Sequence, residues 1–239
     1  MQMKPSLTFY TNIISPYQLD FFSELAKLFT LRVVFYAQSE NDRSWTLSVN
    51  ETNYEVIFLK TSKLAKFIQK FMTSYHFSAS IFRVSYFDTS DNIILGGNYF
   101  IPNTLVALFL SSLRRKKIYW FGERLYSAGP IKTFVKKIML QPILRLTDGV
   151  FAVGADAIAS YKGYGYQRDC FNIPYNIDNK KFDKKLLEDK KLKALQQTLN
   201  AENKLIVLTS GSLISRKGMD VAIRAFRAVA AENKSRSEL

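Results

Sequence analysis

The sequence predicts an α/β fold in which a parallel, doubly wound sheet carries helices on both faces. Strand-like and helix-like segments alternate through nearly the whole chain, which is the order of consecutive β-α units. Several strand-like runs are almost continuously apolar, as in "LRVVFYA" at 31–37. Such runs are typical of strands that are buried on both faces. The predicted architecture is therefore Rossmann-like.

The strands are predicted from short apolar runs that are bounded by polar residues or glycine. These runs lie at 7–12, 31–37, 54–60, 92–98, 117–123 and 149–154. A further run, "LIVLTS" at 205–210, belongs to the C-terminal part of the chain. Residues 170–178 are expected to be extended and to leave the sheet.

The helices are predicted where apolar residues recur at helical spacing. These segments lie at 15–29, 63–72, 101–115, 131–146, 155–165 and 183–199. The first helix should have Ser15 as its N-cap and Pro16 at its first helical position. The helix at 131–146 should be kinked or split at Pro142, because proline cannot donate a backbone hydrogen bond.

The composition excludes several kinds of site. The chain has 239 residues, of which 47% are hydrophobic, so it can form a substantial core. A single cysteine, Cys170, excludes a disulfide framework, and a single histidine, His76, argues against a histidine metal centre or a Ser-His-Asp triad. The first residues contain no long apolar run, so no signal peptide is expected and the predicted location is cytoplasmic.

The excess of positive charge is concentrated in the middle of the chain. Residues 60–147 contribute +11 of the total net charge of +14. Such a zone predicts an anionic partner, either a membrane surface or a phosphorylated substrate. Nucleic acid is not the expected partner, because no nucleic-acid-binding motif accompanies the charge. The basic helices at 63–72 and 131–146 either face the core and expose solvated lysines, or dock peripherally on the inner face of the cell membrane.

A glycine turn and a basic pair follow the last strand-like run, in "SGSLISRKGMD" at 210–220. Gly211 lets the backbone turn sharply, and the segment from Ser215 to Gly218 is expected to open a helix. Free N–H groups at a helix N-terminus attract anions, and Arg216 and Lys217 add two positive charges there. A diphosphate fits such a site, and a solvated pair at a helix start is the alternative.

Four segments together resemble glycosyltransferase family 4, the retaining enzymes of the GT-B fold. "LTSGSLISRKGMDVAIRAF" at 208–226 looks like the opening of the donor-binding domain, and 154–182 resembles the end of the acceptor domain, with Tyr175 interrupting the family's Pro-Asn run. "TNIISPYQLDFFSEL" at 11–25 is similar to the first loop and helix of a polysaccharide-assembling subgroup, and "WFGE" at 120–123 to its Trp-x-x-Glu strand end.

The resemblance implies transfer of a sugar, with retention, from a UDP- or GDP-linked nucleotide sugar to a saccharide or lipid-linked acceptor, in surface polysaccharide biosynthesis. It implies neither a cofactor nor a required metal, because cationic side chains neutralise the leaving diphosphate. Gly211, Arg216 and Lys217 match the diphosphate-binding positions. The alternatives are a non-catalytic module that binds an acceptor or a membrane, and a GT-B nucleotide-sugar epimerase.

Other candidate residues lie at the first loop and at strand ends. Asn12, Tyr17 and Gln18 are expected to contact acceptor or donor, with Gln18 standing where the subgroup tends to have arginine. Glu123 either contacts a sugar as the candidate catalytic residue, or pairs with Arg124 or caps the next turn. The pair Gly96-Gly97 forms either a tight turn or a close backbone approach to a ligand.

The alternation of strands and helices is interrupted by Pro174 and a lysine-rich run. The predicted organisation is an acceptor-side domain at 1–170, an interdomain segment at 171–203, and the truncated start of a nucleotide-sugar-binding domain at 204–239. The second donor motif of the family, Glu-x₇-Glu, lies downstream of the basic pair. The second Rossmann-like domain is therefore expected to be incomplete, and the chain to be inactive alone.

Overall fold

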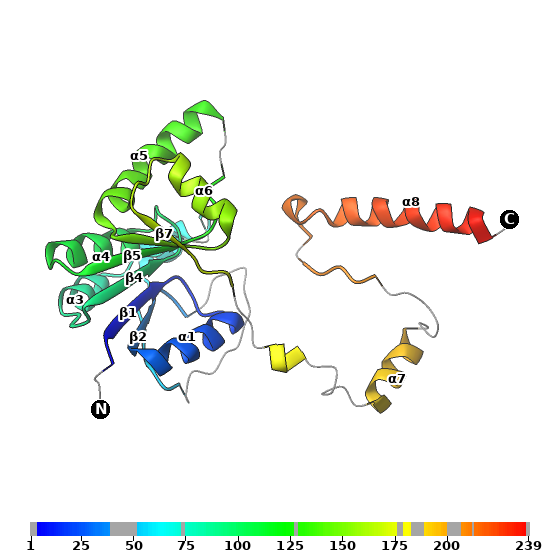
Figure 1. Ribbon diagram of the computed structural model, residues 1–239, viewed down its shortest axis with the longest axis horizontal. Coiled ribbons are helices and arrows are strands. Elements are labelled where there is room, and N and C mark those ends of the chain that lie inside the picture. The colour runs from blue at the N-terminus through cyan, green and yellow to red at the C-terminus, as the bar shows by residue number, and fades with distance from the viewer. Residues whose placement is uncertain are drawn as a thin grey trace. The chain divides into compact units, whose positions relative to one another are not determined.

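The structure is a computed structural model that describes residues 4–38, 52–72, 75–126, 129–175, 179–182, 189–199, 207–211 and 213–237. The chain divides into two compact units, Met1–Asp178 and Asn179–Leu239. The first unit is a sheet with helices packed on it, and the second contains α7 and α8 (Figure 1).

A seven-stranded, wholly parallel sheet forms the centre of the first unit, in the order β3-β2-β1-β4-β5-β6-β7. Its strands are β1 (Ser6–Thr11), β2 (Thr30–Phe35), β3 (Glu55–Phe58), β4 (Asn92–Gly96), β5 (Lys117–Gly122), β6 (Gly149–Ala152) and β7 (Asp169–Asn172). The predicted doubly wound parallel sheet is confirmed. The expectation that the chain leaves the sheet at residue 170 is wrong, because Cys170 and Phe171 pair with Val150 and Phe151 and so complete the outer edge of β6.

Helices follow most of the strands, as the alternation predicts. They are α1 (Pro16–Leu28), α2 (Lys63–Ile68), α3 (Ser80–Tyr86), α4 (Pro102–Leu113), α5 (Pro130–Leu146) and α6 (Ala155–Gly163). The short α3 was not predicted, and α2 ends earlier than expected. The helix α5 is not split at Pro142. This proline lies on the exposed side of the helix. Water can therefore donate to the backbone carbonyl, one turn earlier, that proline leaves without a donor.

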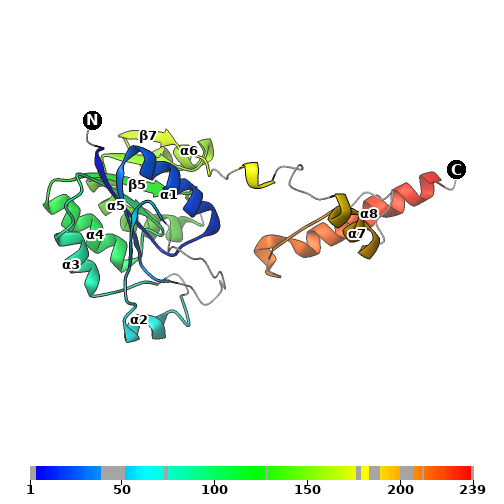
Figure 2. The same ribbon diagram turned by 90° about the horizontal axis from the view of Figure 1, so that it is seen from below.

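The helices cover the two faces of the sheet unequally. On one face α1 packs Phe22 and Ala26 against a cluster that includes Phe9 and Phe35. On the other face α3, α4, α5 and α6 pack on a larger cluster centred on Trp120. Figure 2 shows α1 on the opposite side of the strands from α3 and α4. The sheet is therefore buried on both faces, which explains its continuous apolar runs.

The second unit contains a 3₁₀ turn at Asn179–Phe182, the helix α7 (Asp189–Thr198), a 3₁₀ turn at Ser215–Lys217 and the helix α8 (Met219–Ser237). The strand expected at 205–210 is not present at 207–210, and its first two residues lie outside the described residues. A parallel strand needs a neighbour for its hydrogen bonds, and none of the described residues of this unit is in a strand. The first residues of the helix expected at 183–199, up to 188, also lie outside the described residues.

A buried carboxylate ties the first strand to the loop between α3 and β4. The side chain of Asp88 is fully buried and accepts hydrogen bonds from Thr8 Oγ1 at 3.1 Å and Tyr10 Oη at 2.8 Å. The guanidinium of Arg32 lies 3.5 Å from the same carboxylate. Burial, and then the nearby charge of Asp88, raise the pKa of Tyr10, which keeps its hydroxyl protonated as a donor.

Replacing Asp88 by alanine should destabilise the first unit. The change removes the acceptor of two buried hydroxyls and a charge partner of Arg32. We expect the free energy of unfolding, measured by urea denaturation, to fall by about 2–4 kcal/mol. The control is Asp91→Ala, which removes an exposed carboxylate bonded to Ser6 Oγ at 3.0 Å. Equal losses in the two variants would contradict a structural role for the buried carboxylate.

Candidate functional site

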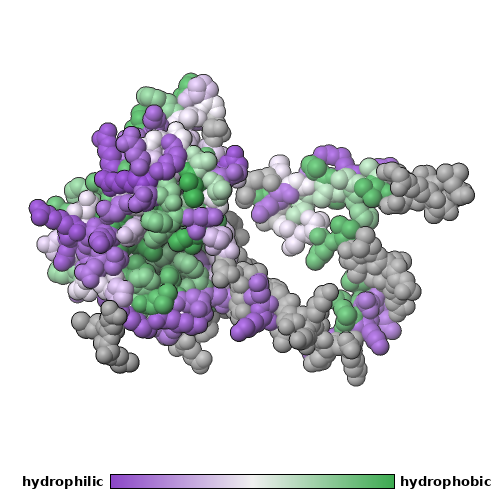
Figure 3. Space-filling model, viewed as in Figure 1, coloured by the Kyte–Doolittle hydropathy of each residue, from purple (hydrophilic) through white to green (hydrophobic). Residues whose placement is uncertain are grey.

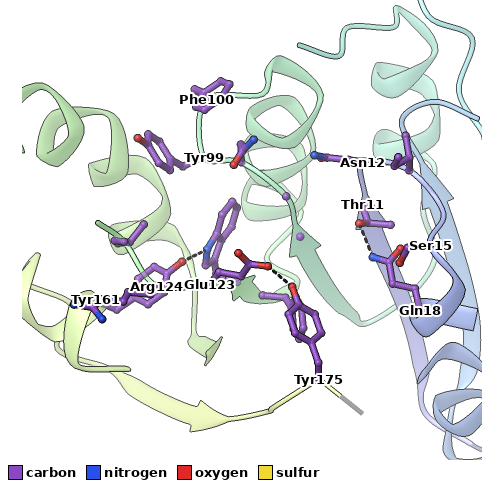
Figure 4. A pocket seen from close by; sticks show the side chains of 18 of the residues that line it. Thr11, Asn12, Ser15, Gln18, Tyr99, Phe100, Glu123, Arg124, Tyr161 and Tyr175 are labelled. Atoms are coloured by element: carbon purple, nitrogen blue, oxygen red, sulfur yellow. Dashed lines mark hydrogen bonds between the residues drawn. The ribbon is translucent and has the colours of Figure 1, made fainter. Parts of the chain in front are cut away.

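A cavity of about 470 Å³ opens at the carboxyl edge of the sheet. Segments that directly follow β1, β4 and β5 line it, together with parts of α1, α5 and α6 (Figure 4). Its volume is typical of small-molecule sites. The predicted loop and strand-end residues all lie in its lining, namely Asn12, Tyr17, Gln18, Gly96, Gly97 and Glu123.

Glycine allows two of these segments to approach each other closely. Gly97 has a φ of +99°, which favours glycine, and a Cβ there would lie 2.2 Å from Asn12 Oδ1. A Cβ on Gly96 would lie 3.1 Å from Phe9 Cε1, closer than most such contacts. Gly96 ends β4 and Gly97 bends the backbone against the first loop, while the hydrogen-bonded turn lies at the residues that follow, where Ile101 N donates to Asn98 O at 3.1 Å.

A buried hydrogen bond between β5 and α6 joins two residues of the cavity lining. Trp120 Nε1 donates to Tyr161 Oη at 2.7 Å. A Cβ on Gly122 would lie 2.0 Å from this hydroxyl oxygen, so only glycine fits there. Burial raises the pKa of Tyr161, and its hydroxyl stays protonated at neutral pH. The packing fixes the end of β5, and therefore the position of the next residue, Glu123.

Glu123 is exposed and accepts a hydrogen bond from the Tyr175 hydroxyl (Figure 4). The ring of Tyr175 also packs edge-on against Tyr17, with 5.0 Å between centroids. Burial, followed by the bond to the Glu123 carboxylate, raises the pKa of Tyr175. The predicted alternative partner, Arg124, instead forms an ion pair with Asp156 at 2.8 Å. The Glu123 carboxylate is therefore held at the cavity without a cation bound to it among the described residues.

Three polar atoms of the first loop and α1 are buried without a hydrogen-bond partner among the residues that the structure describes. They are Asn12 Oδ1, Ser15 Oγ and Gln18 Oε1. Ser15 stands at the predicted N-cap of α1, yet its side chain makes no capping hydrogen bond. All three residues line the cavity. A buried polar atom without a hydrogen-bond partner lowers the free energy of unfolding by about 1–3 kcal/mol, so the three atoms are an unusual concentration of cost in one part of the lining.

Sequence reasoning missed several aromatic residues of the cavity. Tyr99 and Phe100 lie shortly after the end of β4, and Tyr126 lies shortly after the end of β5, so their closeness to strand ends was an available signal. Tyr161 lies inside α6 and gives no such signal. Together with Tyr175, these rings give the cavity walls that are apolar on their faces and polar at four hydroxyl groups.

The remaining predicted residues, Gly211, Arg216 and Lys217, belong to the second unit. The basic pair lies in the 3₁₀ turn at Ser215–Lys217, and Gly218, with a φ of +62°, connects this turn to α8. The expectation that Ser215 to Gly218 open the helix is therefore wrong, because α8 begins at Met219. Lys217 is exposed, and the two residues directly precede the N-terminus of the helix.

Two further properties of the described residues bear on other kinds of site. No group of three or more histidine, cysteine, aspartate or glutamate side chains there could hold a metal ion. Among the described helices, none combines the length and the apolar character that crossing a membrane requires.

Comparison with known proteins shows the fold. No protein-family model and no curated protein sequence matches the chain. Crystal structures of Anabaena Alr3699/HepE, in complex with UDP-glucose and with UDP, are similar to this chain with TM-scores of 0.65 and 0.66. Each alignment covers 92% of this chain at 13% sequence identity, and 57% of the HepE chain. The chain therefore spans less than two thirds of HepE and shares its α/β, Rossmann-like architecture.

Proposed function

We propose that this chain is part of a glycosyltransferase and that its first unit holds a saccharide or lipid-linked saccharide acceptor in the cavity. One observation carries the proposal. An aromatic-walled cavity lies at the carboxyl edge of a parallel sheet, and three residues of its lining have buried side-chain oxygens without a partner among the described residues. Ligands bind at this edge in open α/β sheets.

A sugar carries the hydrogen-bond donors that the unpartnered oxygens of this lining lack. Asn12 Oδ1 and Gln18 Oε1 are hydrogen-bond acceptors, and Ser15 Oγ can donate or accept. The hydroxyl groups of a sugar can donate to all three. The apolar C–H faces of the same ring can pack on the flat faces of Tyr99 and Tyr175.

The proposed donor is a UDP- or GDP-linked nucleotide sugar. HepE, which shares the fold, is bound to UDP-glucose and to UDP in its crystal structures. In this chain Arg216 and Lys217 would neutralise the diphosphate, next to the free N–H groups at the start of α8 and the turn at Gly211. Neither a metal ion nor a separate cofactor has a role in this scheme, because the cations stabilise the leaving group.

Glu123 is the proposed catalytic residue. Its carboxylate, held by the Tyr175 hydroxyl, would orient the acceptor hydroxyl toward the anomeric carbon. The acceptor oxygen bonds to that carbon, the bond from the carbon to the diphosphate oxygen breaks, and the acceptor proton leaves with the diphosphate. We propose that the configuration at the anomeric carbon is retained.

Each part of the chain has a role in the proposed enzyme. Residues 1–170 form the acceptor side, 171–203 connect the two parts, and 204–239 belong to the nucleotide-sugar-binding part. The proposed setting is the cytoplasm, at the inner face of the cell membrane, in the biosynthesis of surface polysaccharide. The charge of the first unit supports this setting, because residues 60–147 carry +11.

Ser15 and Ser62 both stand at helix N-caps, and comparing them tests whether the Ser15 hydroxyl has no hydrogen-bond partner. Ser62 Oγ accepts from Ala65 N at 3.1 Å, so Ser62→Ala should lower the free energy of unfolding by about 1 kcal/mol. Ser15 makes no such bond, so Ser15→Ala should leave it unchanged or raise it by up to about 1 kcal/mol. Urea denaturation measures the free energy of unfolding of both variants. If Ser15→Ala destabilises as much as Ser62→Ala, its hydroxyl has a protein partner and the central observation fails.

Because the chain is expected to be inactive alone, sugar transfer is tested on the whole glycosyltransferase of which it is proposed to be part, with labelled UDP-glucose or GDP-mannose and octyl glucoside as the acceptor. We expect label in a glycosylated octyl glucoside, and about a hundredfold lower turnover for Glu123→Gln. Glu24→Gln is the matched control, because Glu24 is an exposed glutamate of α1 paired with Lys27. Label recovered only in an altered nucleotide sugar would contradict transfer and indicate an epimerase.

A further inference from the structure

The helix α5 exposes a set of large apolar residues to solvent, in addition to the apolar residues that it packs against the core. Leu140 and Ile143 are its buried residues. Its exposed large apolar side chains are Ile131 (78%), Phe134 (65%), Val135 (48%), Ile138 (55%) and Met139 (41%). These five recur at helical spacing and form one stripe, the outer face of α5. In a helix whose only role is to cover a core, such a stripe points inward.

Cations border this stripe. Lys132 and Lys137 are exposed and lie on its two sides at helical spacing, and Arg145 continues the charge toward the end of the helix. The segment Pro130–Leu146 contains no aspartate or glutamate. Figure 3 shows hydrophobic and hydrophilic side chains next to each other over the projecting end of α5. The outer face is therefore both apolar and strongly basic.

The opposite side of the same helical turns reaches the cavity. Lys136 is partly buried, lines the cavity and donates to the backbone carbonyl of Tyr126. Tyr126 itself lines the cavity. One helix therefore separates the candidate acceptor site from the outer face, and anything that binds that face lies one helix diameter, about 10 Å, from the site.

A second helix of the first unit repeats the pattern. Leu64, Phe67 and Phe71 in and after α2 are exposed, and so are Lys66 and Lys70. One interpretation was that the basic helices face the core with their apolar residues and expose only lysines. These three exposed apolar side chains contradict it. The same mixture of exposed apolar and basic side chains therefore occurs on two separate helices of the first unit.

We propose that the outer face of α5 docks in the plane of an anionic lipid bilayer. Its apolar side chains would enter the boundary between head groups and acyl chains, and its lysines would contact lipid phosphates. A protein partner suits the surface less well, because lysine is depleted in protein–protein interfaces. A helix with this many cations lies on the membrane and does not cross it. Docking of this face would bring a lipid-linked acceptor to the adjoining cavity, and only this consequence rests on the proposed function.

The test is co-sedimentation of the full-length protein with vesicles of phosphatidylglycerol and phosphatidylcholine, and with vesicles of phosphatidylcholine alone. We expect binding to the anionic vesicles at low salt and release at high salt. Lys132→Gln/Lys137→Gln should weaken binding roughly 30-fold, since each lysine contributes about 1 kcal/mol. Ile131→Ser/Phe134→Ser should weaken it by about tenfold or more.

Matched controls are available elsewhere on the first unit. Leu28→Ser/Leu113→Ser removes two apolar side chains of similar exposure, 66% and 65%, from other helices. Lys27→Gln/Lys117→Gln removes two exposed lysines away from α5. Both controls should bind like the unaltered protein. Equal binding to neutral vesicles, equal losses in the control variants, or no vesicle binding at all would overturn the proposal.

A fluorescent reporter checks insertion directly. Phe134→Trp places an indole on the outer face, and its emission should shift to shorter wavelength when anionic vesicles are added, while Leu28→Trp should show no shift. A shift in neither variant would contradict insertion of this face. These measurements involve no sugar transfer, so a failure here leaves the transferase proposal standing, and a failed transfer assay leaves the docking proposal standing.

Discussion

Parallel strand pairing is the constraint on which the candidate site depends. Strands that run in one direction all end at the same edge, so the segments after β1, β4 and β5 meet although they are far apart in the chain. Their closest approaches leave no room for a side chain. A Cβ would lie 2.2 Å from a neighbouring oxygen at Gly97 and 2.0 Å at Gly122. These glycines therefore allow the segments that line the cavity to pack closely against one another.

The sequence predicts much of the fold because its signals are local. Strands buried on both faces read as continuous apolar runs, and every strand of the sheet except β7 was expected from such a run. Several site residues were predictable for a related reason. Asn12 and Glu123 come directly after strands, and in a parallel sheet that position alone places them at the ligand-binding edge.

The features of the fold and of the site that could not be predicted from the sequence depend on tertiary contacts. The pairing of β7 depends on β6, about 20 residues earlier, and Tyr161 enters the cavity through a hydrogen bond to Trp120, 41 residues away. The pattern at Ser15 predicts an N-cap correctly, but not that its hydroxyl makes no capping bond. The apolar stripe of α5 has the same periodicity whether it faces the core or water, because periodicity defines a face and not its surroundings. Only the packing of Leu140 and Ile143 decides the direction.

The outer face of α5 also affects how the protein molecules interact with one another in a solution without membranes. With a net charge of +14 and an isoelectric point of about 9.7, molecules at neutral pH repel one another over a distance set by the ionic atmosphere. At about 1 M salt that distance shrinks to about 3 Å, while attraction between apolar surfaces persists and strengthens in sulfate or phosphate. Colloidal stability therefore depends on ionic strength: dilute buffer keeps the molecules apart, and concentrated salt lets the exposed stripes of two molecules meet.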